Sequence, residues 1–136
     1  MSAEAASERP RHILVINDTV AILELFRAIL EDEGYQVTTD GFATESTALL
    51  KRVIDLHPDV IILDLLIVDE QRGWQFLQML KMERQTSSIP VIVCTGAARL
   101  VEELQVHLDT MGVGVVLKPF DIDVLLREVA QKLPTT

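Results

Sequence analysis

The stretch that decides the fold reads Pro58-Asp59-Val60-Ile61-Ile62-Leu63-Asp64, in which four apolar residues are followed by a carboxylate. A short β-branched run that begins after a proline predicts a strand buried on both faces of a parallel sheet. Its last residue, Asp64, then lies at the rim formed by the carboxyl ends of the strands, where open α/β sheets carry out their ligand chemistry. We therefore expect Asp64 to be the working residue.

Apolar runs of this kind recur along the chain and alternate with amphipathic, helix-like segments. The predicted strands cover residues 12–17, 35–39, 59–64, 90–95 and 113–118. Apolar residues at three- and four-residue spacing predict helices from Thr19 to a stop at Gly34, and over 44–56, 74–82, 97–110 and 121–133. Such alternation predicts an α/β fold: a five-stranded, parallel, doubly wound sheet in the flavodoxin-like order 2-1-3-4-5, with helices on both faces.

Length and charge limit the classes of function. A chain of 136 residues forms one ordinary domain, which we place at 12–136 after a disordered tail over 1–11. The net charge of -9 repels nucleic acid and anionic membrane. Neither a signal peptide nor a membrane span is visible, and the single Cys94 sits inside an apolar run as a buried core residue of a reducing compartment. These features predict a cytoplasmic protein.

Polar residues follow the predicted strands at the edge where Asp64 lies. Asn17 and Asp18 come after the first strand, which neighbours the strand of Asp64. Two carboxylates converging from adjacent strands suit Mg²⁺, which prefers oxygen ligands in octahedral geometry. We therefore expect Asp18 and Asp64 to bind Mg²⁺, with the backbone carbonyl of Leu66 as a third protein ligand.

The fourth and fifth strands end on Thr95 and Lys118. A hydroxyl donor and a fixed positive charge are the groups needed to hold the oxygens of a phosphoryl group during its transfer to a carboxylate. Asp64 is then the nucleophile, and the product is an acyl phosphate.

These motifs together resemble the response-regulator receiver domain of two-component signalling. The matching stretches are Ile13-Leu14-Val15-Ile16-Asn17-Asp18, Gly34-Tyr35, Pro58 to Asp64, Ile89-Pro90-Val91-Ile92 through Thr95-Gly96, and Lys118-Pro119-Phe120. The resemblance implies that Asp64 receives a phosphoryl group from the histidine of a sensor kinase or phosphotransfer protein, with Mg²⁺ bound. It also implies a cis peptide between Lys118 and Pro119, and no enzymatic turnover beyond the protein's own phosphorylation and dephosphorylation.

Three positions depart from the family's usual pattern. Asn17 stands where an acidic residue is usual, so we expect its amide oxygen to orient a metal-bound water and Mg²⁺ binding to be weaker. The loop after Asp64 lacks the usual proline, and its glycine, Gly73, comes one residue later. Val115 replaces the usual aromatic residue three positions before Lys118, so any switch must use helix or loop shifts.

Two readings of the function stay open. No output module follows Leu133, so we expect a stand-alone receiver that signals by contact with a downstream protein. Its partner surface would be the helix 97–110, the strand 113–118 and the helix 121–133, which is also a surface for a homodimer. The alternative is a receiver-like adaptor that works without phosphorylation, for which Asn17, the altered loop after Asp64 and Val115 argue. A flavin carrier or an aspartyl hydrolase on the same fold ranks below both, because residues 17–20 are not a phosphate-binding loop.

Overall fold

The computed structural model describes residues 10–65 and 70–133. Its strands form one parallel sheet in the order β2-β1-β3-β4-β5, which confirms the predicted doubly wound topology. The strands are β1 (His12–Ile16), β2 (Gln36–Asp40), β3 (Val60–Asp64), β4 (Val91–Thr95) and β5 (Val113–Leu117).

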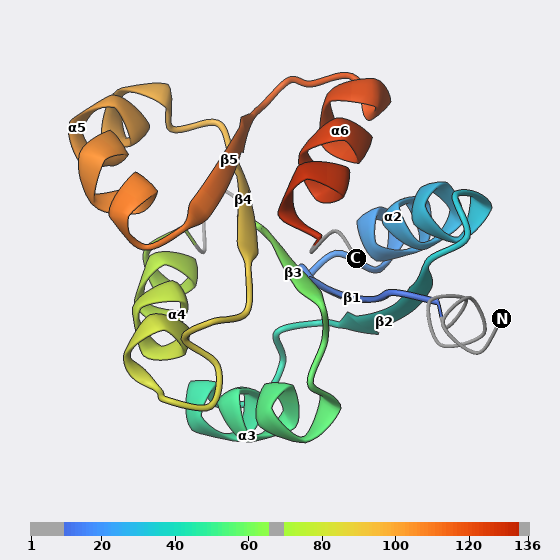
Figure 1. The fold of residues 1–136 in the computed structure, drawn as a ribbon, viewed down its shortest axis with the longest axis horizontal. Helices are drawn as coiled ribbons and strands as arrows, with labels where there is room; N and C mark the ends of the chain where they lie inside the picture. The colour runs from blue at the N-terminus through green and yellow to red at the C-terminus, as the bar shows by residue number, and fades with distance from the viewer. Residues whose placement is uncertain (1–9, 66–69, 134–136) are drawn as a thin grey trace, which may run out of the picture.

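Helices cover both faces of the sheet (Figure 1). α2 (Val20–Asp32) and α6 (Ile122–Lys132) lie on one face, and the other face carries α3 (Ser46–Leu56), α4 (Glu70–Met82) and α5 (Ala98–Thr110). Alternate strand residues pack into two separate cores, because successive side chains of a strand point to opposite faces. Leu14, Ile61 and Leu63 meet α3 and α4, whereas Ile13, Val60 and Ile62 meet α2 and α6.

Burial follows the order of the strands. Every residue of β3 and β4 is buried, whereas the edge strands β2 and β5 keep partly exposed positions. The polar residues that end β3 and β4, Asp64 and Thr95, are buried along with them. A buried carboxylate needs partners inside the protein, so the environment of Asp64 decides what this edge of the sheet can do.

The ends of α2 lie where the sequence predicts them. Thr19 is the N-cap residue, although its backbone carbonyl rather than its side chain makes the capping contacts, accepting bonds from Ile22 and Leu23. At the other end Gly34 has a φ of +91°, a conformation that glycine adopts without a steric penalty. α2 therefore ends at Asp32, and the turn through Gly34 leads the chain into β2 at Gln36.

α4 differs from its prediction. It begins at Glu70, whereas the sequence pattern placed its start at Trp74 after Gly73. Gly73 is a buried residue inside the helix, and a Cβ atom built on it would lie 2.0 Å from Cδ2 of Leu65. The glycine therefore serves close packing of α4 on the segment after Asp64, which the local sequence does not reveal.

Two further expectations, a cis peptide and a buried cysteine, are confirmed. The peptide between Lys118 and Pro119 is cis, and Cys94 is fully buried, as predicted. Burial raises the pKa of the Cys94 thiol, which keeps it protonated and unreactive. The tail expected to be disordered spans residues 1–11, of which residues 1–9 lie outside the described part of the chain.

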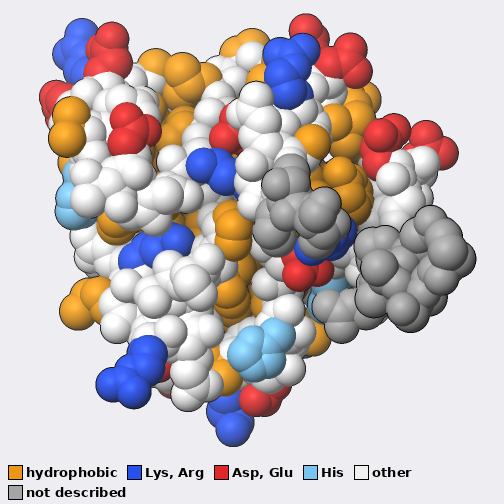
Figure 2. Space-filling view, in the orientation of Figure 1, with side chains coloured by type: hydrophobic (Ala, Val, Ile, Leu, Met, Phe, Trp, Pro, Cys, Tyr) orange, Lys and Arg blue, Asp and Glu red, His pale blue; other side chains and the backbone are white. Residues whose placement is uncertain are grey.

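Within the described residues, no helix is both long and apolar enough to cross a membrane. Figure 2 shows that Lys and Arg side chains are scattered singly over one face of the molecule and form no broad basic patch there. Acidic side chains on this face gather mainly in its upper half, over α5 and around α6 and α2. This distribution agrees with the acidic composition of the chain.

Candidate functional site

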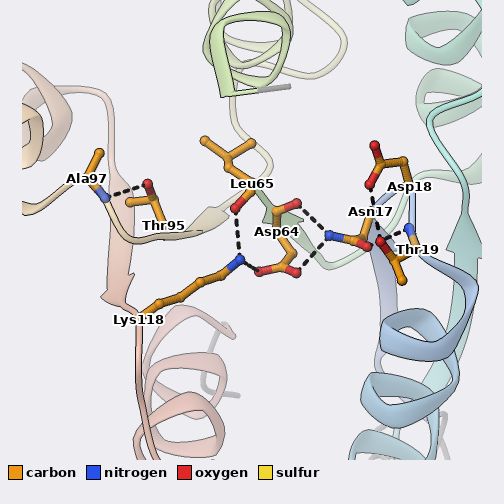
Figure 3. Close-up of polar contacts among 8 residues, drawn as sticks. All are labelled: Asn17, Asp18, Thr19, Asp64, Leu65, Thr95, Ala97 and Lys118. Carbon is orange, nitrogen blue, oxygen red and sulfur yellow. Dashed lines mark hydrogen bonds and ion pairs between the residues drawn. The ribbon is translucent and has the colours of Figure 1, made fainter. Parts of the chain in front are cut away.

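The sheet register brings the predicted site residues to one edge. Ile16 pairs with Leu63, so Asn17 follows β1 beside the end of β3. Asp64 pairs with Cys94 of β4, the residue before Thr95. The backbone N–H of Lys118 donates to the carbonyl of Thr95 at 2.8 Å, which holds the end of β5 against β4. Figure 3 shows Asp64 in the middle of this row, with Lys118 on one side and Asn17 on the other.

Lys118 contacts both Asp64 and the residue after it. Its Nζ forms an ion pair with Oδ1 of Asp64 at 2.9 Å and donates to the Leu65 carbonyl at 2.8 Å (Figure 3). The Asp64 side chain is only 2% exposed, whereas that of Lys118 is 28% exposed. The ammonium group is therefore held by two acceptors at the mouth of the site and neutralises a buried charge.

Asn17 holds the other side of Asp64, and its neighbours determine which way the amide points. Its Nδ2 donates to the backbone carbonyl of Asp64 at 2.9 Å and to Oδ2 at 2.8 Å, both of which can only accept. Its Oδ1 accepts the backbone N–H of Thr19 at 2.7 Å, which can only donate. An aspartate at this position could not make the first two bonds, so Asn17 fits Asp64 as a neutral hydrogen-bond donor.

The environment of Asp64 raises its pKa above the usual value for an aspartate. Desolvation by burial is the largest cause, and the negative charge of Asp18 acts in the same direction. The hydrogen-bonding and charge effects of Lys118 oppose both but do not cancel them. The ionised carboxylate thus depends on Lys118 and gains from any further cation at the site.

Asp18 and Thr95 lie at the same edge of the sheet, where their side chains make hydrogen bonds with Thr19 and Ala97. Asp18 is exposed, and its carboxylate accepts a 3.5 Å contact from the Thr19 hydroxyl. The Thr95 hydroxyl accepts the backbone N–H of Ala97 at 3.1 Å (Figure 3). Because it accepts that bond, the hydroxyl keeps its own hydrogen to donate to an incoming oxygen.

The donor set suits a hard divalent cation. Oδ1 of Asp64 is buried, touches Lys118 as an ion pair, and accepts no well-aligned hydrogen bond from the described residues. Together with the exposed carboxylate of Asp18 it offers two oxygen ligands of the kind that Mg²⁺ prefers. In the described ranges, no three or more Asp, Glu, His or Cys side chains are grouped so that they could hold a metal ion together, so water or backbone carbonyls would complete the coordination.

Two of the predicted metal contacts involve Leu66 and Asn17. The carbonyl of Leu66 lies outside the described residues. The oxygen of Asn17, expected to orient a metal-bound water, accepts the Thr19 N–H in this structure, and its role toward a metal stays a prediction.

An apolar groove, not anticipated from the sequence, opens onto the site. It has a volume of about 310 Å³, lies between α2 and α6, and has Asp64 and Lys118 among its lining residues. Its apolar lining includes Ile22, Leu25, Ile29, Phe120 and Ile122. Leu25 is 58% exposed and Ile122 is 50% exposed, so the groove presents large apolar side chains to solvent. The signal available in the sequence was an apolar face on α2 wider than one core stripe requires.

Comparison with known proteins gives a consistent result. The family model described as "Response regulator receiver domain" matches residues 13–130. The DNA-binding dual master transcriptional regulator RpaA of Synechocystis sp. is 32% identical over 126 residues, which cover 91% of this chain and 49% of RpaA. The phosphate regulon transcriptional regulatory protein PhoB of Klebsiella pneumoniae is 34% identical over 111 residues, covering 81% of this chain and 46% of PhoB. The chain thus spans about half the length of these two relatives.

Solved structures agree with the family match. The chemotaxis protein CheY4 of Vibrio cholerae superimposes with a TM-score of 0.73 at 25% identity, covering 91% of this chain and 99% of CheY4. A CheY-like receiver domain protein of Methanospirillum hungatei gives a TM-score of 0.71 at 26% identity, covering 90% of this chain and 93% of that protein.

Proposed function

This chain belongs to the response-regulator receiver family, and from that premise we propose that Asp64 accepts a phosphoryl group from the phosphohistidine of a sensor kinase or phosphotransfer protein. The observation that carries the proposal is the buried Asp64 carboxylate, paired at 2.9 Å with Lys118 at the carboxyl edge of the sheet. One carboxylate oxygen attacks phosphorus as the P–N bond breaks, and the bonding electrons leave with the imidazole.

The residues around Asp64 divide the work of this transfer. Lys118 neutralises charge on the transferring group, and Thr95 donates its hydroxyl hydrogen to a phosphoryl oxygen. Asn17 holds Oδ2 and the backbone carbonyl of Asp64, which orients the carboxylate. Asp18 and Asp64 would hold Mg²⁺, which when bound supplies positive charge for the phosphoryl oxygens.

Two surfaces of the molecule are suited to partner proteins. The groove between α2 and α6 gives a phosphodonor an apolar approach to Asp64 and Lys118. The face formed by α5, β5 and α6 serves a downstream protein or a second copy of the chain. We propose that the protein is cytoplasmic and turns over no separate substrate. We also propose that it makes no direct contact with nucleic acid or membrane, because its net charge of -9 repels both.

A second candidate is an adaptor that binds its partner without phosphorylation. Both carboxylate oxygens of Asp64 already have a neighbour, Lys118 at Oδ1 and Asn17 at Oδ2. Val115 on β5 has no aromatic ring to change rotamer in response to Thr95. A site that is neutralised before phosphorylation, with no ring to report it, favours a constitutive binding surface.

Intact-mass analysis after incubation with Mg²⁺ and acetyl phosphate separates the two candidates. The parent is expected to gain one phosphoryl group, Asp64→Asn none, and the exposed control Asp55→Asn one. Lys118→Ala is expected to slow the gain without abolishing folding. No gain by a folded parent supplied with metal would support the adaptor instead.

A further inference from the structure

The first turn of α4 carries an arginine that the functions above do not use. Arg72 stands one residue before Gly73 and reaches across to the segment between β2 and α3. Its Nη1 donates to the backbone carbonyl of Phe42 at 2.5 Å, and its Nη2 donates to the carbonyl of Thr44. One guanidinium group therefore binds two carbonyls of a segment about thirty residues away in the sequence, which is a demanding geometry that its planar fork can meet.

Aromatic contacts reinforce this attachment. The centre of the guanidinium group lies 3.8 Å from the centroid of the Phe42 ring, at cation–π distance. The same ring packs edge to face on Phe76 of α4, with the centroids 5.8 Å apart. Phe42 has a φ of 60°, and its N–H donates to Oδ1 of Asp40 at 2.9 Å. The backbone turn at Phe42 thus presents its carbonyl and its ring to α4 together.

The first turn of α4 in turn packs on the phosphoacceptor site. Gly73 lies so close to Leu65 that a Cβ atom there would be 2.0 Å from Cδ2 of Leu65. Leu65 is buried, its N–H donates to Cys94 at 2.8 Å, and its carbonyl receives Nζ of Lys118 at 2.8 Å. A continuous series of contacts therefore leads from Arg72 through Gly73 and Leu65 to the ammonium group beside Asp64.

We propose that Arg72 is a positioning residue for the phosphoacceptor site. Arg72 attaches the first turn of α4 to the carbonyls of Phe42 and Thr44 and so holds α4 against Leu65. Leu65 held in this place directs its carbonyl toward the ammonium group of Lys118. The effect on phosphoryl transfer rests on the function proposed above, whereas the effect on Leu65 does not.

The test compares Arg72→Ala and Arg72→Lys with a matched control, Arg27→Ala. Arg27 also joins a helix to backbone and side-chain acceptors of β2, at Val37 and Thr39, but it lies on the opposite face of the sheet. Both alanine variants lose comparable contacts, so urea unfolding should show similar losses of stability. Any change at Leu65 that appears only in the Arg72 variants therefore reports position and not general loosening.

Two readouts decide the question. Methyl NMR shifts of Leu65 and hydrogen exchange of its amide should change in Arg72→Ala, change less in Arg72→Lys, and stay as in the parent in Arg27→Ala. The rate of phosphorylation by acetyl phosphate should fall about tenfold in Arg72→Ala. That loss should disappear in a Lys118→Ala background, because a residue acting through Lys118 has nothing left to position.

Unchanged Leu65 signals in Arg72→Ala, or equal changes in Arg27→Ala, would overturn the proposal. A rate loss that is the same with and without Lys118 would overturn the route through the ammonium group. If the parent takes up no phosphoryl group, the proposed function fails, and the Leu65 signals alone decide the positioning role. If Arg72→Ala does not fold, Arg72→Lys carries both readouts.

Discussion

Replacing Asn17 with aspartate tests how this site balances its charge. In the present structure Nδ2 of Asn17 donates to Oδ2 and to the backbone carbonyl of Asp64 at 2.8 and 2.9 Å. Asn17→Asp removes both donors and places a second carboxylate against a buried first one. Losing a hydrogen bond to a charged group costs about 1.5–3 kcal/mol. Two unit charges ~4 Å apart at an effective dielectric constant of ~20 repel by about 4 kcal/mol, which protonation of one of them limits.

We therefore expect the free energy of unfolding of metal-free Asn17→Asp to fall by roughly 3–5 kcal/mol, using those two contributions. A divalent cation relieves the same repulsion, so Mg²⁺ should bind more tightly than to the parent. Recovery of about 2 kcal/mol corresponds to roughly thirtyfold in the dissociation constant. Magnesium should consequently restore most of the lost stability, since a ligand that binds only the folded state stabilises it.

Urea unfolding with and without Mg²⁺, together with calorimetric titration of the metal, measures both effects. Asn17→Ala serves as the control, because it removes the donors without adding charge. It should lose stability and gain no affinity for Mg²⁺. Equal stability of metal-free Asn17→Asp and parent, or unchanged Mg²⁺ affinity, would refute the description of Asn17 as a neutral donor that replaces a carboxylate.

Three further outcomes follow from the same structure. Gly73→Ala places a methyl group against Leu65 and should lower the free energy of unfolding by about 1–3 kcal/mol in urea titrations. NMR spectra should show shift changes that report a displacement of α4. An unchanged urea midpoint would contradict the close packing. Because the folded-state pKa of Asp64 is raised, the folded protein binds the proton more tightly than the unfolded chain does. Its contribution to stability is therefore greatest at low pH and is lost as pH rises from about 3.9, the ordinary aspartate value, through the folded-state pKa. Metal-free Asp64→Asn should accordingly have a higher urea midpoint than the parent at pH 7 and a similar one near pH 4, and equal midpoints at pH 7 would contradict the sign. Cys94 is buried with a raised thiol pKa, so a thiol reagent at pH 8 should label it only as fast as the protein opens, and rapid labelling of the native protein would argue against its burial.

Much of the architecture follows from short-range patterns in the sequence. The apolar runs of β1, β3 and β4 predict buried parallel strands, and alternation with amphipathic segments leaves few arrangements because crossovers are right-handed. The positions of Asn17, Asp64, Thr95 and Lys118 at strand ends follow from the same patterns, since parallel strands end at one edge. The cis peptide before Pro119 was implied only by the resemblance to receivers.

Positions that depend on contacts between distant segments were not visible in the sequence. Glycine is typical of a helix boundary, yet Gly73 lies inside α4, where the helix packs closely on Leu65. The contacts that the structure gives Arg72 come from the segment after β2, which supplies two carbonyls and an aromatic ring from about thirty residues away. Ile29 fits the core stripe of α2 by spacing, but it lines the groove beside Asp64, where residues of α6 form the other wall.

The orientation of the Asn17 side-chain amide shows most clearly what the tertiary structure determines and the sequence does not. From the sequence alone, an amide beside Asp18 at the end of β1 could offer either an oxygen to a metal-bound water or an N–H group to Asp64. The neighbouring atoms fix the orientation. The Thr19 N–H can only donate, so it faces the amide oxygen, and the carboxylate and carbonyl of Asp64 can only accept, so they face the amide nitrogen. The sequence by itself therefore determined the sheet, its order and the residues that gather at its edge, because periodicity and chain direction are local properties. Only the tertiary structure decided which atoms of those residues face one another, because hydrogen bonds and packing are made between segments that the sequence keeps apart.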